Sequence, residues 1–184
     1  SLIVTILLFS GIIKVDNVTS TSIANIISVD KYSLLLKVVV LLLSLSISTV
    51  GKELISDTLK LRSEFWTLFM ISLTGMIMLT SVTEMITAWV ALELTSLPLI
   101  GMLSLNKQRY SLEISFKYLI LSATSSAIIL MGISQLYGLS GSTFFSGIMP
   151  LKDALGGRFV FEDSTQLLII FSLILIISGF SFKI

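Results

Sequence analysis

The stretch that decides the fold is WVALELTSLPLIGML, residues 89–103. It lies within a run of 22 residues, Met85 to Asn106, in which Glu93 is the only charged residue. A helix needs about 20 apolar residues to cross the hydrocarbon core of a bilayer. The run therefore predicts a transmembrane helix with a carboxyl group near its middle, about 12 Å along the helix axis from Met85.

The composition of the whole chain is that of a membrane protein. Of its 184 residues, 54% are hydrophobic and 12% are charged, against about a quarter charged in soluble domains. The net charge of +1 gives no field that would attract nucleic acid. The chain has neither cysteine nor histidine, which excludes disulfides, haem or iron–sulfur ligation by these residues, and a histidine proton relay.

The other charge-free runs predict the remaining helices, because a membrane span must close all its backbone hydrogen bonds internally. We expect an all-α, polytopic transmembrane helix bundle that forms a single membrane domain over residues 1–184. The expected full helices cover residues 32–51, 65–83, 85–105, 113–137 and 164–184. The short run over residues 1–13 is interpreted as the tail of a helix whose beginning is missing.

Glu93 is the first candidate functional residue. A carboxylate at the centre of a membrane helix costs about 2.5 to 3.5 kcal/mol, so it usually faces a protein interior or a water path and has a partner. We favour an ion or proton site, and the structural alternative is a protonated side chain hydrogen-bonded to a neighbouring helix. Pro98 frees a backbone carbonyl near Leu94 where water or an ion could bind, although such kinks also occur without function.

Two lysines complete the candidate set. Lys117 follows Glu113 at i+4, the favourable order for a helical ion pair, and a solvated pair at the helix entrance is the simpler interpretation. Lys183 is most simply an interfacial lysine by its position. It lies about 28 Å along its helix from Ser164, so it reaches the middle of the membrane only if that helix begins outside the bilayer.

Three segments together resemble subunit 2 of respiratory NADH:quinone oxidoreductase, complex I. They are WVALELTSLPLIGML, SLEISFKYLILSATSSAIILMGISQLYGLSG from residue 111, and the terminal GFSFKI. The resemblance extends from Glu64 onward and implies the first part, the N-terminal half, of an antiporter-like inverted-repeat fold. It also implies that Glu93, Lys117 and Lys183 transfer protons inside the membrane, with Glu93 and Lys183 as a coupled pair.

The same resemblance implies a proton-translocating subunit of NADH:ubiquinone reductase that performs no redox chemistry itself. NADH, FMN, iron–sulfur clusters and quinone are expected elsewhere in the complex, and no cofactor or metal on this chain. The expected partners are other membrane-arm subunits and membrane lipids. Because half of an inverted repeat cannot close a path, we also expect a second polypeptide with the C-terminal half, and the alternative is that this sequence is a fragment of a longer subunit. The expected location is the inner mitochondrial membrane, with the bacterial plasma membrane as the alternative.

Two other functions stay open at this stage. The first is a subunit of a multisubunit Na+/H+ antiporter, a family built on the same helix plan. The motifs ELTSLPL and SFKYLILSATSS resemble complex I subunit 2 and favour complex I. The second is a scaffold of the membrane arm that no longer translocates protons. The presence of Glu93, Lys117 and Lys183 argues against it, since burying unneeded charge is costly.

Overall fold

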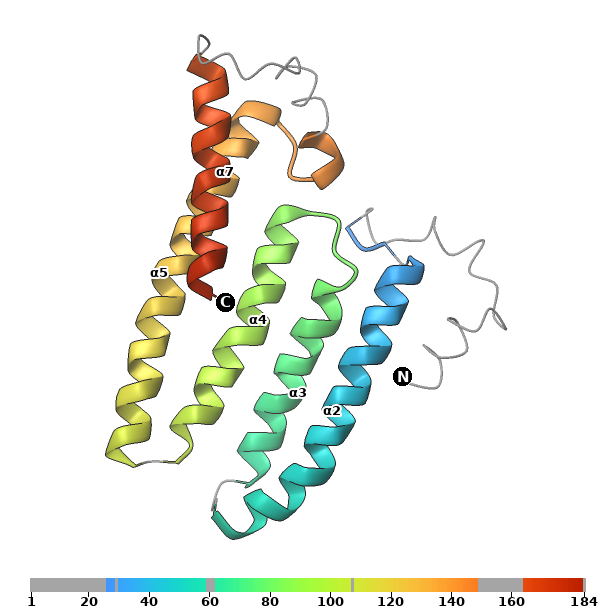
Figure 1. Cartoon of the computed structure of the whole chain (residues 1–184), viewed down its shortest axis with the longest axis vertical. Coiled ribbons are helices and arrows are strands. Elements are labelled where there is room, and N and C mark those ends of the chain that lie inside the picture. The colour runs from blue at the N-terminus through green and yellow to red at the C-terminus, as the bar shows by residue number, and fades with distance from the viewer. Residues whose placement is uncertain (1–25, 29, 59–61, 107, 149–163, 184) are drawn as a thin grey trace. The chain divides into compact units, whose positions relative to one another are not determined.

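The computed structural model describes residues 26–28, 30–58, 62–106, 108–148 and 164–183. They form five α-helices and one short 3-10 helix (Figure 1): α2 (Lys31–Thr58), α3 (Arg62–Leu79), α4 (Met85–Ser104), α5 (Arg109–Ser140), η2 (Phe145–Ile148) and α7 (Ser164–Lys183). Extended pairing in these residues is limited to two isolated bridges, Ile27 with Val82 and Glu84 with Phe144. The predicted all-α fold is confirmed for the described part of the chain.

Two helices continue well past the charge-free runs that predicted them. α2 extends beyond Gly51 to Thr58, and α5 begins at Arg109 and ends at Ser140. A charged residue marks where a chain leaves hydrocarbon, but lysine, arginine and glutamate are good helix formers and do not end a helix. The partial helix expected over residues 1–13 lies outside the described residues.

The helix α3 ends earlier than the run over residues 65–83 suggested. Its last residue is Leu79, and the Thr80 hydroxyl donates a hydrogen bond to the Ile77 carbonyl over 2.8 Å. The amide of Ser81 then donates to the Met78 carbonyl over 3.1 Å. Threonine and serine side chains compete with the helix for backbone partners, so this uncharged TSVT stretch forms a tight turn and not a further helical turn.

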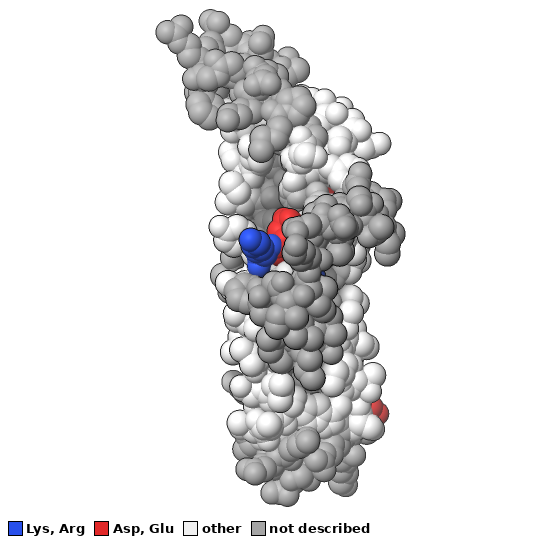
Figure 2. Space-filling view, turned by 90° about the vertical axis from the view of Figure 1, so that its right-hand side faces the viewer, with Lys and Arg blue, Asp and Glu red and all other residues white. Residues whose placement is uncertain are grey.

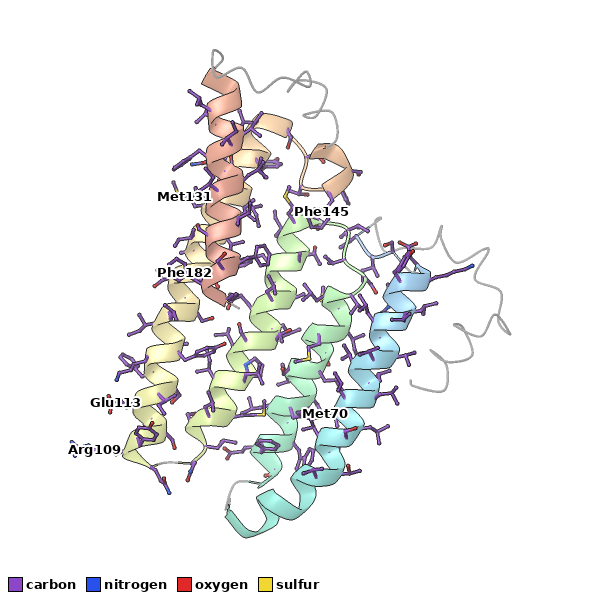
Figure 3. The ribbon with its side chains drawn as sticks, viewed as in Figure 1. Met70, Arg109, Glu113, Met131, Phe145 and Phe182 are labelled. Atoms are coloured by element: carbon purple, nitrogen blue, oxygen red, sulfur yellow. The ribbon has the colours of Figure 1, made fainter. Side chains whose placement is uncertain are left out.

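Three described helices are long and apolar enough to cross a membrane, over Lys31–Gly51, Met85–Ser104 and Arg109–Ser140. Ser63–Leu79 and Leu167–Lys183 are apolar but shorter. Large hydrophobic side chains such as Met70, Met131 and Phe182 are 54%, 58% and 58% exposed and project away from their helices (Figure 3). The face drawn in Figure 2 carries few acidic or basic side chains on its described surface. Such a surface suits lipid or other membrane helices.

The described contacts divide the chain into two compact units, and the single membrane domain stays a prediction. The first unit contains α2, α3, residues 91–104 of α4 and residues 109–116 of α5. In it α2 packs against α3. α3 and α4 are antiparallel, because Gly75 lies against Thr95 while Gly101 lies against Leu68. The Ser72 hydroxyl donates across this contact to the Thr95 carbonyl over 3.1 Å.

The second unit contains residues 83–90, α5 from Lys117, η2 and α7. Its core is a cluster of buried apolar side chains on α4, α5 and α7, with Trp89 and Ile176 packed against it: Met85, Ile129, Ile133, Leu136 and Ile169. The Trp89 indole donates to the Ser126 carbonyl over 3.2 Å. This unit positions Lys117 and Lys183, whereas the first unit positions Glu93.

α5 and α7 approach each other at two glycines. A Cβ at Gly132 would lie 2.6 Å from Cγ1 of Ile176, and a Cβ at Gly179 would lie 2.5 Å from Cγ1 of Ile129. Each helix therefore receives an isoleucine of its partner in a notch that only glycine leaves open. Later positions of α7 meet earlier positions of α5, so the two helices are antiparallel.

Candidate functional site

Glu93 lies close to the middle of α4 and is half-buried. The side of α4 that meets α3 carries Thr95, whose amide nitrogen would lie 2.8 Å from a Cβ at Gly75. Successive helical residues turn by about 100°, so Glu93 points away from α3. It lies in line with Val90 and Leu97, which are 43% and 49% exposed. The carboxyl group is thus on a different side of α4 from the α3 contact.

Pro98 lies five residues after Glu93 within α4, which continues through it to Ser104. The proline ring is buried. Because proline has no amide hydrogen, the Leu94 carbonyl loses its helical partner at i+4. The Leu94 carbonyl carbon lies in the contact with α3, 2.9 Å from a Cβ placed at Gly75, so binding of water or an ion at this carbonyl stays a prediction.

Lys117 and Glu113 are both exposed on α5. Glu113 projects outward one turn after Arg109 near the start of the helix (Figure 3). Lys117 shares its face of α5 with the exposed Leu121 and Thr124, at i+4 and i+7. This face differs from the stripe of α5 that meets α7.

Lys183 is half-buried at the end of α7, on the same helical face as Gly179 at i+4. Gly179 lies against the backbone of Ser125 and Ile129. Because the helices are antiparallel, one turn further along α7 corresponds to about one turn earlier on α5. Position 183 is therefore level with about Ser122, and the end of α7 lies beside the middle part of α5 (Figure 1).

This register shows where Lys183 lies along the length of α5. α5 has 32 residues, Arg109–Ser140, and is therefore about 48 Å long, against a hydrocarbon core of about 30 Å. Ser122 lies close to its midpoint. A helix that starts level with the far end of α5 can thus hold Lys183 at mid-height, which is the condition that the sequence set for an intramembrane lysine.

The three candidate residues are divided between the two units, with Glu93 in the first and both lysines in the second. Lys117 lies on a face of α5 that differs from the face at which α7 carries Lys183. The pairing of Glu93 with Lys183 stays a prediction.

One polar cluster was not singled out from the sequence. Glu84 precedes α4, and its carboxylate accepts hydrogen bonds from the hydroxyls of Thr143 at 2.6 Å and Thr87 at 2.5 Å. The backbone closes the same junction, since Met85 N donates to Thr143 O over 2.9 Å and Phe145 N donates to Thr83 O over 3.1 Å. The hydrogen bond from Thr143, followed by that from Thr87, lowers the pKa of Glu84 below its usual value.

The position of Glu84 could have been singled out from the sequence, but its partner Thr143 could not. An acidic residue is common directly before the first residue of a helix, because the positive end of the helix dipole stabilises its carboxylate. The second partner, Thr143, is 59 residues away, and no local pattern identifies it. Among the described residues no group of three acidic, histidine or cysteine side chains could hold a metal ion.

Comparison with known proteins finds similarity to one family. A family model described as NADH:quinone oxidoreductase/Mrp antiporter, TM, matches residues 82–184. NADH-quinone oxidoreductase subunit N of Buchnera aphidicola is 36% identical over 124 residues, 67% of this chain and 24% of that protein. Subunit N of Acinetobacter baumannii is 31% identical over 85% of this chain and 30% of its own length. Subunit N of Rhodobacter capsulatus is 28% identical over 98% of this chain and 36% of its own length.

A solved structure agrees. A chain of respiratory complex I from Thermus thermophilus with bound Aureothin superposes with a TM-score of 0.66 at 25% identity, over 99% of this chain and 37% of that one. This chain thus spans between 24% and 37% of the length of these relatives.

Proposed function

This chain belongs to the NADH:quinone oxidoreductase/Mrp antiporter transmembrane family, and from that premise we propose that it forms the first part of the subunit 2 or subunit N component of complex I. Its proposed role is to translocate protons while quinone is reduced elsewhere in the complex. The observation that carries the proposal is a carboxylate in the middle of the apolar helix α4, together with a half-buried lysine level with the middle of α5. Intramembrane ionisable groups commonly mark proton relays.

The proposed mechanism uses Glu93, Lys117 and Lys183 as proton carriers. In this mechanism Glu93 and Lys183 act as a coupled pair that exchanges a proton. Water entry and a charge arriving from a neighbouring subunit separate the pair. Lys183 then passes its proton along a hydrated axis toward later lysines of the fold.

The partners follow from how much of the fold this chain contains. Inverted-repeat transporters place their path between two repeats, and the relatives are about three times as long as the segment matched here. The proposed partners are therefore the remaining part of the fold, on this or a second polypeptide, other membrane-arm subunits and lipids. NADH, FMN, iron–sulfur clusters and quinone would bind those other parts of the enzyme.

The proposed location is the membrane that houses complex I. The relatives compared above are bacterial, which supports the bacterial plasma membrane, whereas the hydrophobic composition and lack of cysteine agree equally with the inner mitochondrial membrane. Fractionation of the source cells distinguishes the two.

A multisubunit Na+/H+ antiporter is the second candidate, because the description of the matching family names Mrp antiporters as well. The subunit N relatives favour complex I. Purification of the native membrane complex followed by mass spectrometry separates the two candidates. Co-purification of complex I subunits supports the proposal, and co-purification of antiporter subunits without them contradicts it.

The proton-transfer role is tested by Glu93→Gln in the assembled complex, with NADH oxidation and proton translocation measured in the same vesicles. We expect fewer protons moved per NADH oxidised. Glu64→Gln is the matched control, because Glu64 is an exposed acid in the first turn of α3. An unchanged proton yield in Glu93→Gln would favour the scaffold alternative.

A further inference from the structure

The α5 helix contains a row of serines on the side that meets α7. Ser122, Ser125 and Ser126 are 5%, 1% and 6% exposed. The hydroxyls of Ser125 and Ser126 both donate to the Ser122 carbonyl, over 2.7 and 2.9 Å. Bonding to a carbonyl of the same helix is the ordinary way in which a buried serine hydroxyl is satisfied inside an apolar bundle.

Ser122 is different, because its buried hydroxyl has no hydrogen-bond partner among the residues that the structure describes. Elsewhere on α5 the hydroxyls of Ser115, Thr124 and Ser140 each donate to a carbonyl of their own helix. An unsatisfied buried hydroxyl costs about 1–3 kcal/mol. Ordered buried waters typically form their hydrogen bonds with polar groups that are otherwise unsatisfied.

The register of α5 and α7 shows which charged group is near. Gly132 lies against Ser172 and Gly179 lies against Ser125, so the next turn of α7 brings position 183 level with Ser122. Lys183 shares the helical face of Gly179, and Ser122 shares the face of Ser125. The ammonium group and the unsatisfied hydroxyl thus border the same stretch of the α5–α7 contact.

From this arrangement we infer that Ser122 and Lys183 together bind one ordered water molecule between α5 and α7. The water accepts a hydrogen bond from the Lys183 ammonium and exchanges a second one with the Ser122 hydroxyl. Two or more polar partners are what a buried water requires. Ser122 is then a positioning residue, which keeps hydrated the lysine that the proposed function uses, and in this respect the inference rests on that function.

The direct test is a map of the complete complex at a resolution that shows waters. Density for a water within hydrogen-bond distance of Ser122 Oγ and Lys183 Nζ is the expected result. An empty contact, or a side chain of another subunit in that position, would overturn the inference. This measurement needs no variant, so it stands whether or not substitutions at Ser122 assemble.

Variants then separate hydration from packing. Ser122→Ala removes the hydroxyl. We expect it to lower proton translocation by about tenfold, because the water on the Lys183 ammonium loses its hydrogen bond to Ser122. Ser122→Gly also removes the hydroxyl but opens space for a second water. We expect glycine to restore much of the activity. A purely structural role predicts the reverse order, since glycine weakens a helix by about 1 kcal/mol relative to alanine.

The matched control is Ser125→Ala. Ser125 is buried on the same face, but its hydroxyl already has a partner in its own helix. We expect near-normal translocation in Ser125→Ala and loss of a water O–H infrared band, shifted by oxygen-18 water, only in Ser122→Ala. Equal effects of both alanine variants would overturn the inference.

Lys183→Met identifies which proposal fails. If it leaves translocation intact, the proposed function of Lys183 is wrong, whatever the variants at Ser122 do. If it abolishes translocation while Ser122→Ala matches Ser125→Ala, the proposed function stands and the water site is wrong.

Discussion

The contact between α3 and α4 and the contact between α5 and α7 are both close helix approaches through glycine, but they use their hydroxyls differently. In the first contact, the Ser72 hydroxyl crosses to a carbonyl of the other helix. In the second, the hydroxyls of Ser125 and Ser172 bond to carbonyls of their own helices, and Ser122 is left unsatisfied.

The difference separates two uses of small polar residues in a membrane. A hydroxyl that donates to a carbonyl of another helix holds the two helices together and has used its only hydrogen, so it can no longer donate to a ligand. A hydroxyl left over in a tight contact beside a lysine can bind water instead. The first contact is therefore a structural tie, and the second is the better location for a hydrated charge.

The largest expected effect comes from filling a glycine notch of the second contact. A Cβ at Gly132 would lie 2.8 Å from the Ser172 carbonyl oxygen and 3.2 Å from the Ile176 amide nitrogen. Because backbone must shift, Gly132→Ala should destabilise the protein by about 1–3 kcal/mol. The thermal midpoint of the purified complex measures this. Gly138→Ala on the same helix is the control, with no atom within 4 Å of the added Cβ.

A slightly smaller effect is expected in the first contact. A Cβ at Gly75 would lie 2.7 Å from the Thr95 hydroxyl, which can rotate, and 2.8 Å from the Thr95 amide nitrogen, which cannot. We expect Gly75→Ala to cost about 1–2 kcal/mol. At Gly101 the nearest atom is 3.2 Å away in the flexible Leu68 side chain, so Gly101→Ala should be almost neutral. Equal losses in the two variants would show that helix propensity, and not close approach, decides the outcome.

The second unit should also be sensitive to acid at Glu84. Its folded pKa is lowered by the hydrogen bonds from Thr143 and Thr87. The carboxylate therefore stabilises the fold above its unfolded pKa of about 4.3, and this contribution is lost as the pH falls through the lower folded pKa. Hydrogen exchange at the amides of Met85 and Phe145 should thus accelerate in acid.

Glu84→Gln provides the comparison. Near pH 7 it should expose these two amides more often than in the unmodified protein, by about twofold to fivefold, because solvent screens this carboxylate and limits the loss to about 0.5–1 kcal/mol. As the pH falls through the lowered folded pKa of Glu84, the two proteins should converge, because the unmodified carboxylate becomes protonated. A difference that stays constant over the whole range would show that the charge of Glu84 does not matter.

The smallest effect on stability is expected from loss of the hydrogen bond between Ser72 and Thr95, which joins α3 to α4. Ser72→Ala removes the hydrogen bond to the Thr95 carbonyl, and interhelical bonds of this kind average about 0.6 kcal/mol in membrane proteins. Thr74→Ala is the control, because its exposed hydroxyl bonds only within α3. A thermal midpoint lowered equally in both variants would remove the distinction between a tie and an ordinary hydroxyl.

The sequence predicted the helices well because each is a nearly charge-free run that only a helix can carry through a bilayer. It placed Glu93 near the middle of α4 for the same reason. It misjudged the ends: α3 stops at Leu79 because hydroxyls in the TSVT stretch redirect backbone partners, and hydropathy does not register that competition.

The relations between helices could not be predicted. The height of Lys183 beside Ser122 follows from which α5 residues fit the notches at Gly132 and Gly179, a property of two surfaces and not of either helix. The unsatisfied state of Ser122 was hidden for the same reason, since its neighbours Ser125 and Ser126 have the same residue type and differ only in where their hydroxyls point.

The paired notches also set a mechanical limit. At Gly132 α5 receives Ile176, and at Gly179 α7 receives Ile129, so each helix holds the other against sliding in both directions along the axis. Moving α7 by one turn, about 5.4 Å, would move both isoleucines from the glycines to positions of the other helix that carry a side chain. A piston stroke of α7 is therefore closed to this protein, and Lys183 keeps its height. The proton transfer proposed for Lys183 would then proceed by rearrangement of water and protons around a stationary helix.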